Sequence, residues 1–263
     1  LLANMQIMLT NDDGVYAYGI LALAKALQAQ GGHQIHIVAP DREQSGTAHS
    51  FTFLTPLHAE PVRLEGLENG DAFGVSGTPT DCVKVGVSNL LADTPDCIIS
   101  GINHGQNLGI DTTYSGTVSA ALEGALLGIP SMAVSLVGSM RKLGDKKQAY
   151  FDAAANIAAS LLPRFLQSGS LLWNVNIPAL PQDQIRGVRF TPLARQIYDG
   201  TYVEREDPRD RRYFWTPVSV HYTHDTQTDC DIRWVQEGYI AITPLVQDMT
   251  DYPALQRMQN EAE

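Results

Sequence analysis

The chain has 263 residues, of which 44% are hydrophobic and 18% are charged, so it can bury the core of an ordinary globular protein. Its formal net charge of −11 argues against nucleic acid or an anionic membrane as the main partner, and no stretch approaches the length of a membrane span. The cysteines Cys82, Cys97 and Cys230 are few and widely spaced, which indicates a reducing compartment rather than a disulfide framework. We therefore expect a cytoplasmic protein.

Strand and helix patterns alternate through the first two thirds of the chain. Short apolar runs predict strands at residues 6–10, 34–39, 96–100, 131–136 and 171–177. Helical spacing of apolar residues, or a helix-start signal, predicts helices at residues 18–30, 78–91, 115–128 and 150–166. Residues 51–75 are predicted to be extended with a hairpin turn at 68–71, and residues 101–113 to be a long polar loop. This alternation indicates an α/β protein with a largely parallel sheet that helices cover on both faces.

The pattern changes after residue 194, where aromatic residues alternate with charged ones. Such a segment is not expected to fold into the main core, and its composition is typical of an interface between subunits. We predict three parts: an α/β catalytic domain at residues 1–194, a protruding β-hairpin or oligomerisation segment at 195–235, and a return strand with a C-terminal helix at 236–263.

Two adjacent carboxylates, Asp12 and Asp13, followed by Gly14, lie where the first predicted strand hands over to a helix. In open α/β sheets, ligands bind in the crevice beyond the carboxyl ends of the strands. Two neighbouring anions are stable there when the loop is well solvated or when a cation lies between them. A plain turn explains the same residues, because Asn, Asp and Gly are ordinary turn formers.

Polar residues also follow the next two strong strands. Ser45-Gly46 comes after the second strand, and a stretch containing Asn103 and Asn107 comes after the third. If these loops converge, they offer carboxylate, hydroxyl and amide oxygens, the ligands that Mg²⁺, Mn²⁺ or Ca²⁺ prefer over zinc or copper. The nearby Ser115-Gly116-Thr117 opens a helix, and its backbone N–H groups form a ready site for a phosphate.

Each of these features has a simpler explanation. Ser45-Gly46 can be a plain turn, Ser115 only an N-cap, and Asn103 and Asn107 partners of loop backbone groups. His104 can be a general acid for the leaving oxygen or a solvated loop histidine. A further group on the appendage looks like a metal cluster, although a surface role is the better interpretation: His221, His224, Asp225 and Asp229.

Several longer motifs resemble one family, the SurE survival-protein family of metal-dependent 5′/3′-nucleotidases. They are LTNDDG at residues 9–14, APDREQSG at 39–46, GTPTDCV at 77–83, SGINHGQNLG at 100–109, YSGTVSAALEG at 114–124 and GYIAITPL at 238–245. The match covers nearly the whole chain in one order, so it is far more specific than any single motif.

The resemblance implies a Rossmann-like sheet with a protruding β-hairpin, in a cytoplasmic homodimer or homotetramer. It also implies one divalent ion per subunit, Mg²⁺ or Mn²⁺, held by Asp12, Asp13, Ser45 and Asn103. The substrate's phosphate is expected beside Asn11, Gly46, Asn107 and the loop of Ser115, Gly116 and Thr117. His104 stands at a position that the family pattern does not fix to histidine.

We therefore predict a phosphomonoesterase that removes phosphate from nucleoside 5′- and 3′-monophosphates, with Asp12, Asp13 and Asn103 as catalytic residues. One carboxylate, in our interpretation Asp13, would orient or deprotonate the attacking water. Chemistry through an aspartyl-phosphate is the alternative, but it usually requires two aspartates separated by one residue, whereas these are adjacent. The rival from another class is a non-catalytic nucleotide-binding or scaffold protein on the same fold. The sequence lacks a Gly-x-Gly cradle after the first strand, which such a protein would favour.

Overall fold

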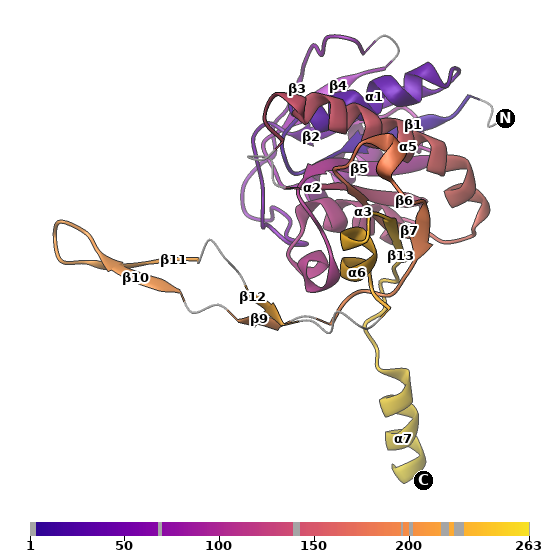
Figure 1. The fold of residues 1–263 in the computed structure, drawn as a ribbon. Helices are drawn as coiled ribbons and strands as arrows, with labels where there is room; N and C mark the ends of the chain where they lie inside the picture. The colour runs from indigo at the N-terminus through magenta and orange to yellow at the C-terminus, as the bar shows by residue number, and fades with distance from the viewer. Residues whose placement is uncertain are drawn as a thin grey trace.

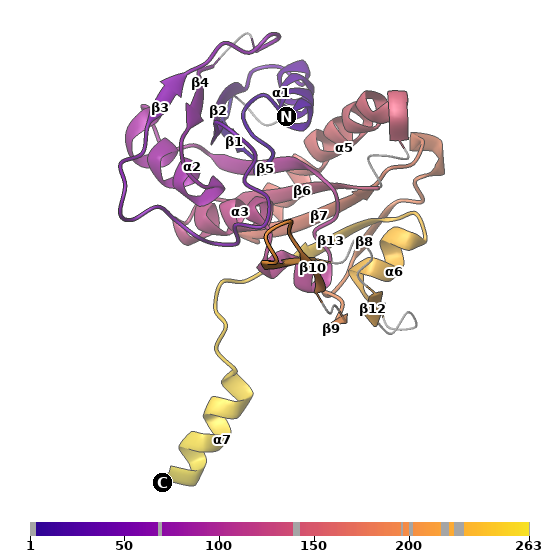
Figure 2. The same cartoon turned by 90° about the vertical axis from the view of Figure 1, so that its left-hand side faces the viewer.

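The computed structural model describes residues 4–67, 70–138, 143–195, 197–199, 202–216, 221–223 and 229–262. These residues form one body built on a nine-stranded sheet, from which a hairpin and the C-terminal helix project (Figures 1 and 2). Among the described helices, none combines the length and the apolar character needed to cross a bilayer.

The sheet has the strand order β3-β4-β2-β1-β5-β6-β7-β13-β8. Its strands are β1 (Gln6–Thr10), β2 (Gln34–Pro40), β3 (Ala59–Pro61), β4 (Ala72–Val75), β5 (Cys97–His104), β6 (Ser131–Val137), β7 (Leu172–Pro178), β8 (Val188–Phe190) and β13 (Ile240–Pro244). The six strands from β4 to β7 in this order are parallel, whereas β3 and β13 run antiparallel to their neighbours β4 and β7.

Helices cover both faces of the sheet. They are α1 (Tyr18–Ala29), α2 (Pro79–Val85), α3 (Gly116–Leu126), α5 (Lys147–Gln167) and α6 (Asp231–Gln236). The C-terminal helix α7 (Tyr252–Ala262) projects away from the sheet (Figures 1 and 2). Short helical turns are η1 (Gly86–Leu90), η2 (Gly109–Thr113), η3 (Gly144–Lys146) and η4 (Gln182–Gln184). The alternation of β1 shows how the two faces are filled. Ile7 and Leu9 pack in the core cluster that holds α1 and α5, and Met8 packs in the cluster with α2 and α3. The predicted α/β fold with a largely parallel sheet is confirmed.

The third strong strand is longer than its sequence predicts. We expected a polar loop from residue 101, yet β5 continues to His104, with a register irregularity between Ser100 and Asn103. Ile102 is fully buried, and Asn103 pairs with Ser135 of β6, so the chain stays in the sheet. This part of the strand was not predicted, because a stretch rich in glycine and polar residues is typical of loops. Asn103 is therefore held by a strand rather than by a free loop.

The segment after residue 194 contains two short antiparallel pairs, β9 (Ile197–Asp199) with β12 (His221–Thr223) and β10 (Val203–Glu206) with β11 (Arg212–Trp215). We call residues 202–216 the hairpin arm. It extends away from the body in Figure 1, and every residue of β10 and β11 is exposed. The predicted division into three parts stays a prediction, as does the turn at 68–71, because Glu68 and Asn69 lie outside the described residues.

The end of this segment returns to the body, in contrast to our expectation for residues 195–235. Cys230, Ile232 and Val235 are buried in a cluster with Leu108 and Ala194. Asp231 is fully buried beside them. One of its carboxylate oxygens accepts from the backbone N–H of Gly109 at 2.8 Å, and the other accepts from those of Ala194 at 2.9 Å and Ile232 at 2.8 Å. Asp231 thus joins α6 to η2 and to the start of the appendage.

We predict that Asp231→Ala lowers the free energy of unfolding by about 3 kcal/mol, because it leaves several buried donors without an acceptor. Urea denaturation of the variant and the wild type measures this difference. Asp229→Ala, at an exposed position of the same segment, is the control and should change stability little. An equal loss in both variants would contradict the anchoring role.

Candidate functional site

The carboxyl ends of three parallel strands lie side by side. β1 pairs with β2 on one side and with β5 on the other, so the loops that follow them open at the same edge of the sheet. A cavity of about 230 Å³, the smaller cavity, lies there and brings together most of the residues predicted for the site. Its lining includes Asp12, Ser45, Gly46, Asn103, Asn107 and Ser115.

Asp13 lines a second cavity of about 440 Å³, the larger cavity. Ser45 and His104 line both cavities, so the two adjoin along these residues. Among the described residues that line these two cavities, Asn11 is not found. Its side chain donates to Gly14 O at 2.8 Å and accepts from Gly14 N at 3.2 Å, so it shapes the turn that presents the carboxylates.

Backbone contacts fix the loop after β1 against the loop after β2. Val15 N donates to Pro40 O at 2.8 Å, and Gln44 N donates to Asp12 O at 2.7 Å. Gly14 has φ +98°, and a Cβ there would lie 3.3 Å from the carbonyl carbon of Arg42, so only glycine suits this close crossing. Ser45 is therefore held near the two carboxylates by main-chain geometry.

Asp12 is only 4% exposed. The hydroxyl and the backbone N–H of Thr117 donate to its two oxygens, and a Cβ on Gly116 would lie 2.9 Å from its Cβ. Burial raises the pKa of Asp12 to about 6, although the Thr117 hydrogen bonds oppose this rise. The start of α3, which the sequence predicted to face a phosphate, therefore also supports a carboxylate, and the close approach requires Gly116.

Asp13 has a different set of neighbours. Its Oδ2 accepts from the backbone N–H of His104 at 3.1 Å, and its Oδ1 lies 3.6 Å from His104 Nδ1. Burial raises the pKa of Asp13 to about 6, and Glu43 adds to the rise. Both carboxylates of the pair are thus poorly solvated and near a like charge, a situation that a bound cation relieves.

The side chain of His104 is 24% exposed, and its ring packs against Phe151 with 4.8 Å between centroids. The interpretation of His104 as a solvated loop residue is therefore wrong. Burial lowers its pKa, and the cation of Lys147 lowers it further, so the imidazole is neutral near pH 7.

The donor set fits a hard divalent cation. Asp12 and Asp13 supply carboxylate oxygens, and Ser45 supplies a hydroxyl whose proton is donated to Glu43 at 2.8 Å. Asn103 donates its amide N–H to Gly105 O at 3.1 Å, which leaves its carbonyl oxygen as an acceptor. The described residues contain no group of three or more His, Cys, Asp or Glu side chains able to hold a metal. A site here depends on hydroxyl and amide oxygens, which suit Mg²⁺ or Mn²⁺ rather than zinc.

Asn107 is hydrogen-bonded to three buried polar residues whose role was not predicted from the sequence. Its Nδ2 donates to Ser135 Oγ at 2.8 Å, and its backbone N–H donates to Asn176 Oδ1 at 2.9 Å. Asn174 and Asn176 both donate to its backbone oxygen, at 2.8 and 3.0 Å. Two asparagines at alternate positions of an otherwise apolar buried strand were the available signal, because buried amides need partners.

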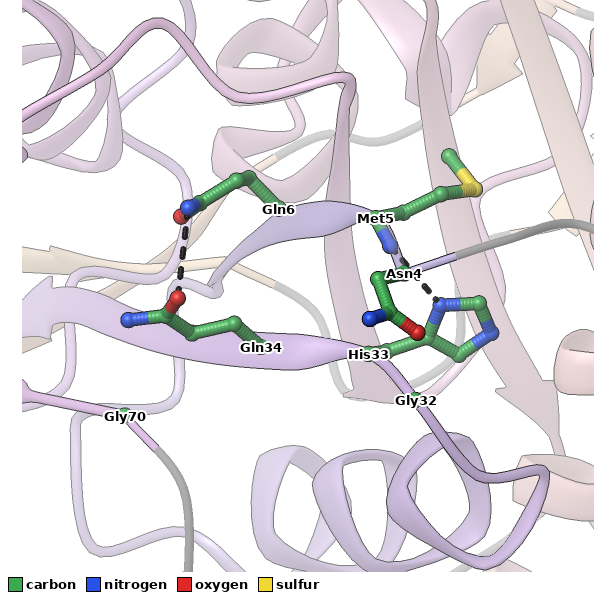
Figure 3. Close-up of a pocket in the computed structure, with 7 residues that line it drawn as sticks. All are labelled: Asn4, Met5, Gln6, Gly32, His33, Gln34 and Gly70. Carbon is green, nitrogen blue, oxygen red and sulfur yellow. Dashed lines mark hydrogen bonds between the residues drawn. The ribbon is translucent and has the colours of Figure 1, made fainter.

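A third pocket, of about 540 Å³, lies at the opposite edge of the sheet, beside the beginnings of β1 and β2 (Figure 3). Its lining includes His33, whose Nδ1 accepts from Met5 N at 3.4 Å, and Gln34, which pairs with Gln6. Its described lining contains no carboxylate, and ligands of parallel sheets bind at the other edge. We therefore assign the chemistry to the smaller and the larger cavity at the carboxyl ends of the strands.

The suggested cluster on the appendage gains no support. His224 and Asp225 lie outside the described residues, as does the side chain of His221. Asp229 accepts a hydrogen bond from Trp234 Nε1.

Residues 7–200 match the family model described as survival protein SurE. The chain belongs to the SurE family. It is 44% identical to a protein named 5′-nucleotidase SurE from Synechococcus sp. (strain JA-3-3Ab), covering 97% of this chain and 96% of that one. A protein of the same name from Desulfitobacterium hafniense (strain DSM 10664 / DCB-2) is 42% identical, with the same two coverages. The crystal structure of the SurE protein from Aquifex aeolicus superposes with a TM-score of 0.77 at 34% identity, covering 98% of this chain and 100% of that one. The predicted family is confirmed.

The raised pKa values predict how stability varies with pH in metal-free protein. The folded state holds protons on Asp12 and Asp13 up to about pH 6, whereas the ordinary pKa of a free aspartate is 3.8. Folding is therefore favoured at acid pH, and the free energy of unfolding decreases as pH rises from about 4 to about 6, by about 3 kcal/mol for each carboxylate.

Urea denaturation at several pH values, in the presence of a chelator, tests this slope. The double variant Asp12→Asn with Asp13→Asn should show a much shallower decrease. Asp111 and Asp231, whose pKa values burial also raises, are unchanged in the variant and contribute equally to both proteins. An identical slope in both proteins would show that the two carboxylates are not responsible.

Proposed function

We propose that this chain is a divalent-metal-dependent nucleotidase that hydrolyses nucleoside 5′- and 3′-monophosphates to nucleoside and phosphate. The observation that carries the proposal is the meeting of Asp12, Ser45, Asn103 and Asn107 on one cavity, in a chain whose relatives are named 5′-nucleotidase. In this proposal Asp12, Asp13, Ser45 and Asn103 hold one Mg²⁺ or Mn²⁺ per subunit. When bound, such an ion neutralises charge on the phosphate and lowers the pKa of a water.

The two carboxylates have unequal tasks in this mechanism. Asp12 accepts from Thr117 on both oxygens, so it is fixed in place and suited to hold the cation. Asp13 accepts a backbone N–H on one oxygen and lines the larger cavity, so it is the better group to orient a water and take its proton.

The phosphate is proposed to lie in the smaller cavity. Gly46 has φ +73°, and nothing lies within 4 Å of a Cβ built there, so a ligand can approach its backbone. Ser115 and Gly116 add the N–H groups of a helix start, while Thr117 acts through Asp12. Asn107, fixed by Ser135 and its asparagine neighbours, presents an amide to the same space.

An aspartyl-phosphate mechanism fits this arrangement less well. Such chemistry usually uses two aspartates separated by one residue, whereas Asp12 and Asp13 are adjacent. A non-catalytic nucleotide-binding protein has no use for two buried carboxylates with raised pKa values beside a phosphate pocket. A cytoplasmic location agrees with Cys82, Cys97 and Cys230, which are all free thiols.

A phosphate-release screen over nucleoside monophosphates, with Mg²⁺, Mn²⁺ or chelator, tests the proposal. We expect turnover only with metal, and a loss of several orders of magnitude in Asp12→Asn and Asp13→Asn. The matched control is Asp96→Asn, which changes a carboxylate bonded to Gln6 N at the other end of β1 and should keep full activity. Metal-independent turnover, or equal activity in all variants, would refute the proposal.

We also propose that the protein is a homodimer or homotetramer joined through the hairpin arm. Tyr202, Phe214 and Trp215 on the arm are 62%, 56% and 63% exposed, although aromatic side chains are favoured in the centre of interfaces. A two-stranded hairpin of this kind is barely stable alone in water, which favours a partner surface.

The double variant Phe214→Ser with Trp215→Ser should lower the oligomer mass measured by light scattering without changing the melting of the body. Phe53→Ser, at an 82% exposed phenylalanine outside the arm, serves as control and should keep the mass of the wild type. A wild type that is already monomeric would exclude this assembly.

A further inference from the structure

An exposed tyrosine lines each of the two cavities of the site. Tyr114 lines the smaller cavity and is 54% exposed, whereas Tyr16 lines the larger cavity and is 65% exposed. An exposed aromatic ring at the mouth of a nucleotide site can stack on a nucleobase, which is a sequence-tolerant contact because every base has a π-face. Either tyrosine could in principle stack on the base of the substrate.

The direction of attack decides between them. In phosphoryl transfer, the attacking and leaving oxygens lie roughly in line on opposite sides of the phosphorus. Asp13, the proposed base, lines the larger cavity, so the water approaches from that side. The leaving nucleoside must then extend away from Asp13, into the smaller cavity. Tyr16 lies on the water side and Tyr114 on the nucleoside side.

The surroundings of Tyr114 suit a nucleoside. It follows η2, directly precedes Ser115 and lines the same cavity as Ser115 and Gly46. Asp111 and Gln106 line the same cavity and are bonded to each other at 3.2 Å. A carboxylate and an amide in this position are able to bind sugar hydroxyls.

The backbone holds Tyr114 in place. Its N–H donates to Asp111 O at 3.0 Å, and its carbonyl accepts from Ala48 N at 3.1 Å, which ties it to the loop that carries Ser45 and Gly46. Asp231 fixes the start of η2 through Gly109 N at 2.8 Å. A stacking residue on such a rigid mount loses little entropy when a base binds.

We propose that Tyr114 is a specificity-determining residue that stacks on the nucleobase of the substrate, while Tyr16 plays no part in base recognition. The inference rests on the proposed nucleotidase function and adds the position of the base. The base lies outside the reacting bond, so the contact should lower KM and leave kcat unchanged.

Steady-state kinetics with adenosine 5′-monophosphate and ribose 5-phosphate, which lacks a base, test this. In the wild type, the nucleotide should have a KM about tenfold lower than the sugar phosphate. Tyr114→Ala should abolish this difference by raising KM for the nucleotide alone, and Tyr114→Phe should keep it. Tyr16→Ala should keep the ratio of the wild type.

An equal effect of Tyr114→Ala on both substrates would overturn the inference, because a structural disturbance does not distinguish them. Loss of the ratio in Tyr16→Ala instead would place the base over the larger cavity and also overturn it. If the wild type hydrolyses ribose 5-phosphate and the nucleotide equally well, phosphatase function stands and base recognition fails. If it hydrolyses neither with either metal, the proposed function itself fails.

Discussion

Asp12 and Asp13 are neighbouring carboxylates that the fold removes from water at the end of β1. Burial raises the pKa of each to about 6, so at neutral pH the metal-free protein holds two charges that would be more stable in solvent. The surrounding structure keeps them there. Thr117 donates twice to Asp12, and the backbone of His104 donates to Asp13. In the proposed activity, a cation bound between them would relieve this unfavourable burial, so part of the lost stability would be recovered when the metal binds.

The parallel sheet is what makes this arrangement possible. Because β2, β1 and β5 are neighbours with the same direction, residues far apart in the sequence reach one edge. The beginning of α3 packs so closely on Asp12 that only glycine fits at position 116. Behind the site, Asn107 is held by hydrogen bonds to residues of β6 and β7, and Asp231 holds the start of η2. The site is thus mounted on strands and short turns of the body, away from the projecting hairpin arm and α7 (Figures 1 and 2).

Much of this could be predicted from the sequence, because apolar strands and helical spacing are local signals. The strand of residues 6–10 matches β1, and the helix at 78–91 corresponds to α2 and η1. The continuation of β5 through Asn103 was not predictable, since its glycine and polar residues are typical of loops. Asn174 and Asn176 escaped notice because their role depends on a partner about 70 residues away. The two hydrogen bonds from Thr117 to Asp12 depend on the tertiary fold, and no spacing in the sequence predicts them.

The central claim is that Asp12 and Asp13 share a divalent cation. It is tested most directly by thermal melting of the wild type and Asp12→Asn, each with chelator and with excess Mg²⁺ or Mn²⁺. The wild type should gain RT ln(1 + [M]/Kd), about 2.7 kcal/mol at a hundredfold excess over Kd, and the variant should gain much less. A variant that keeps the full metal-dependent shift, or a wild type that shows none, would contradict the claim.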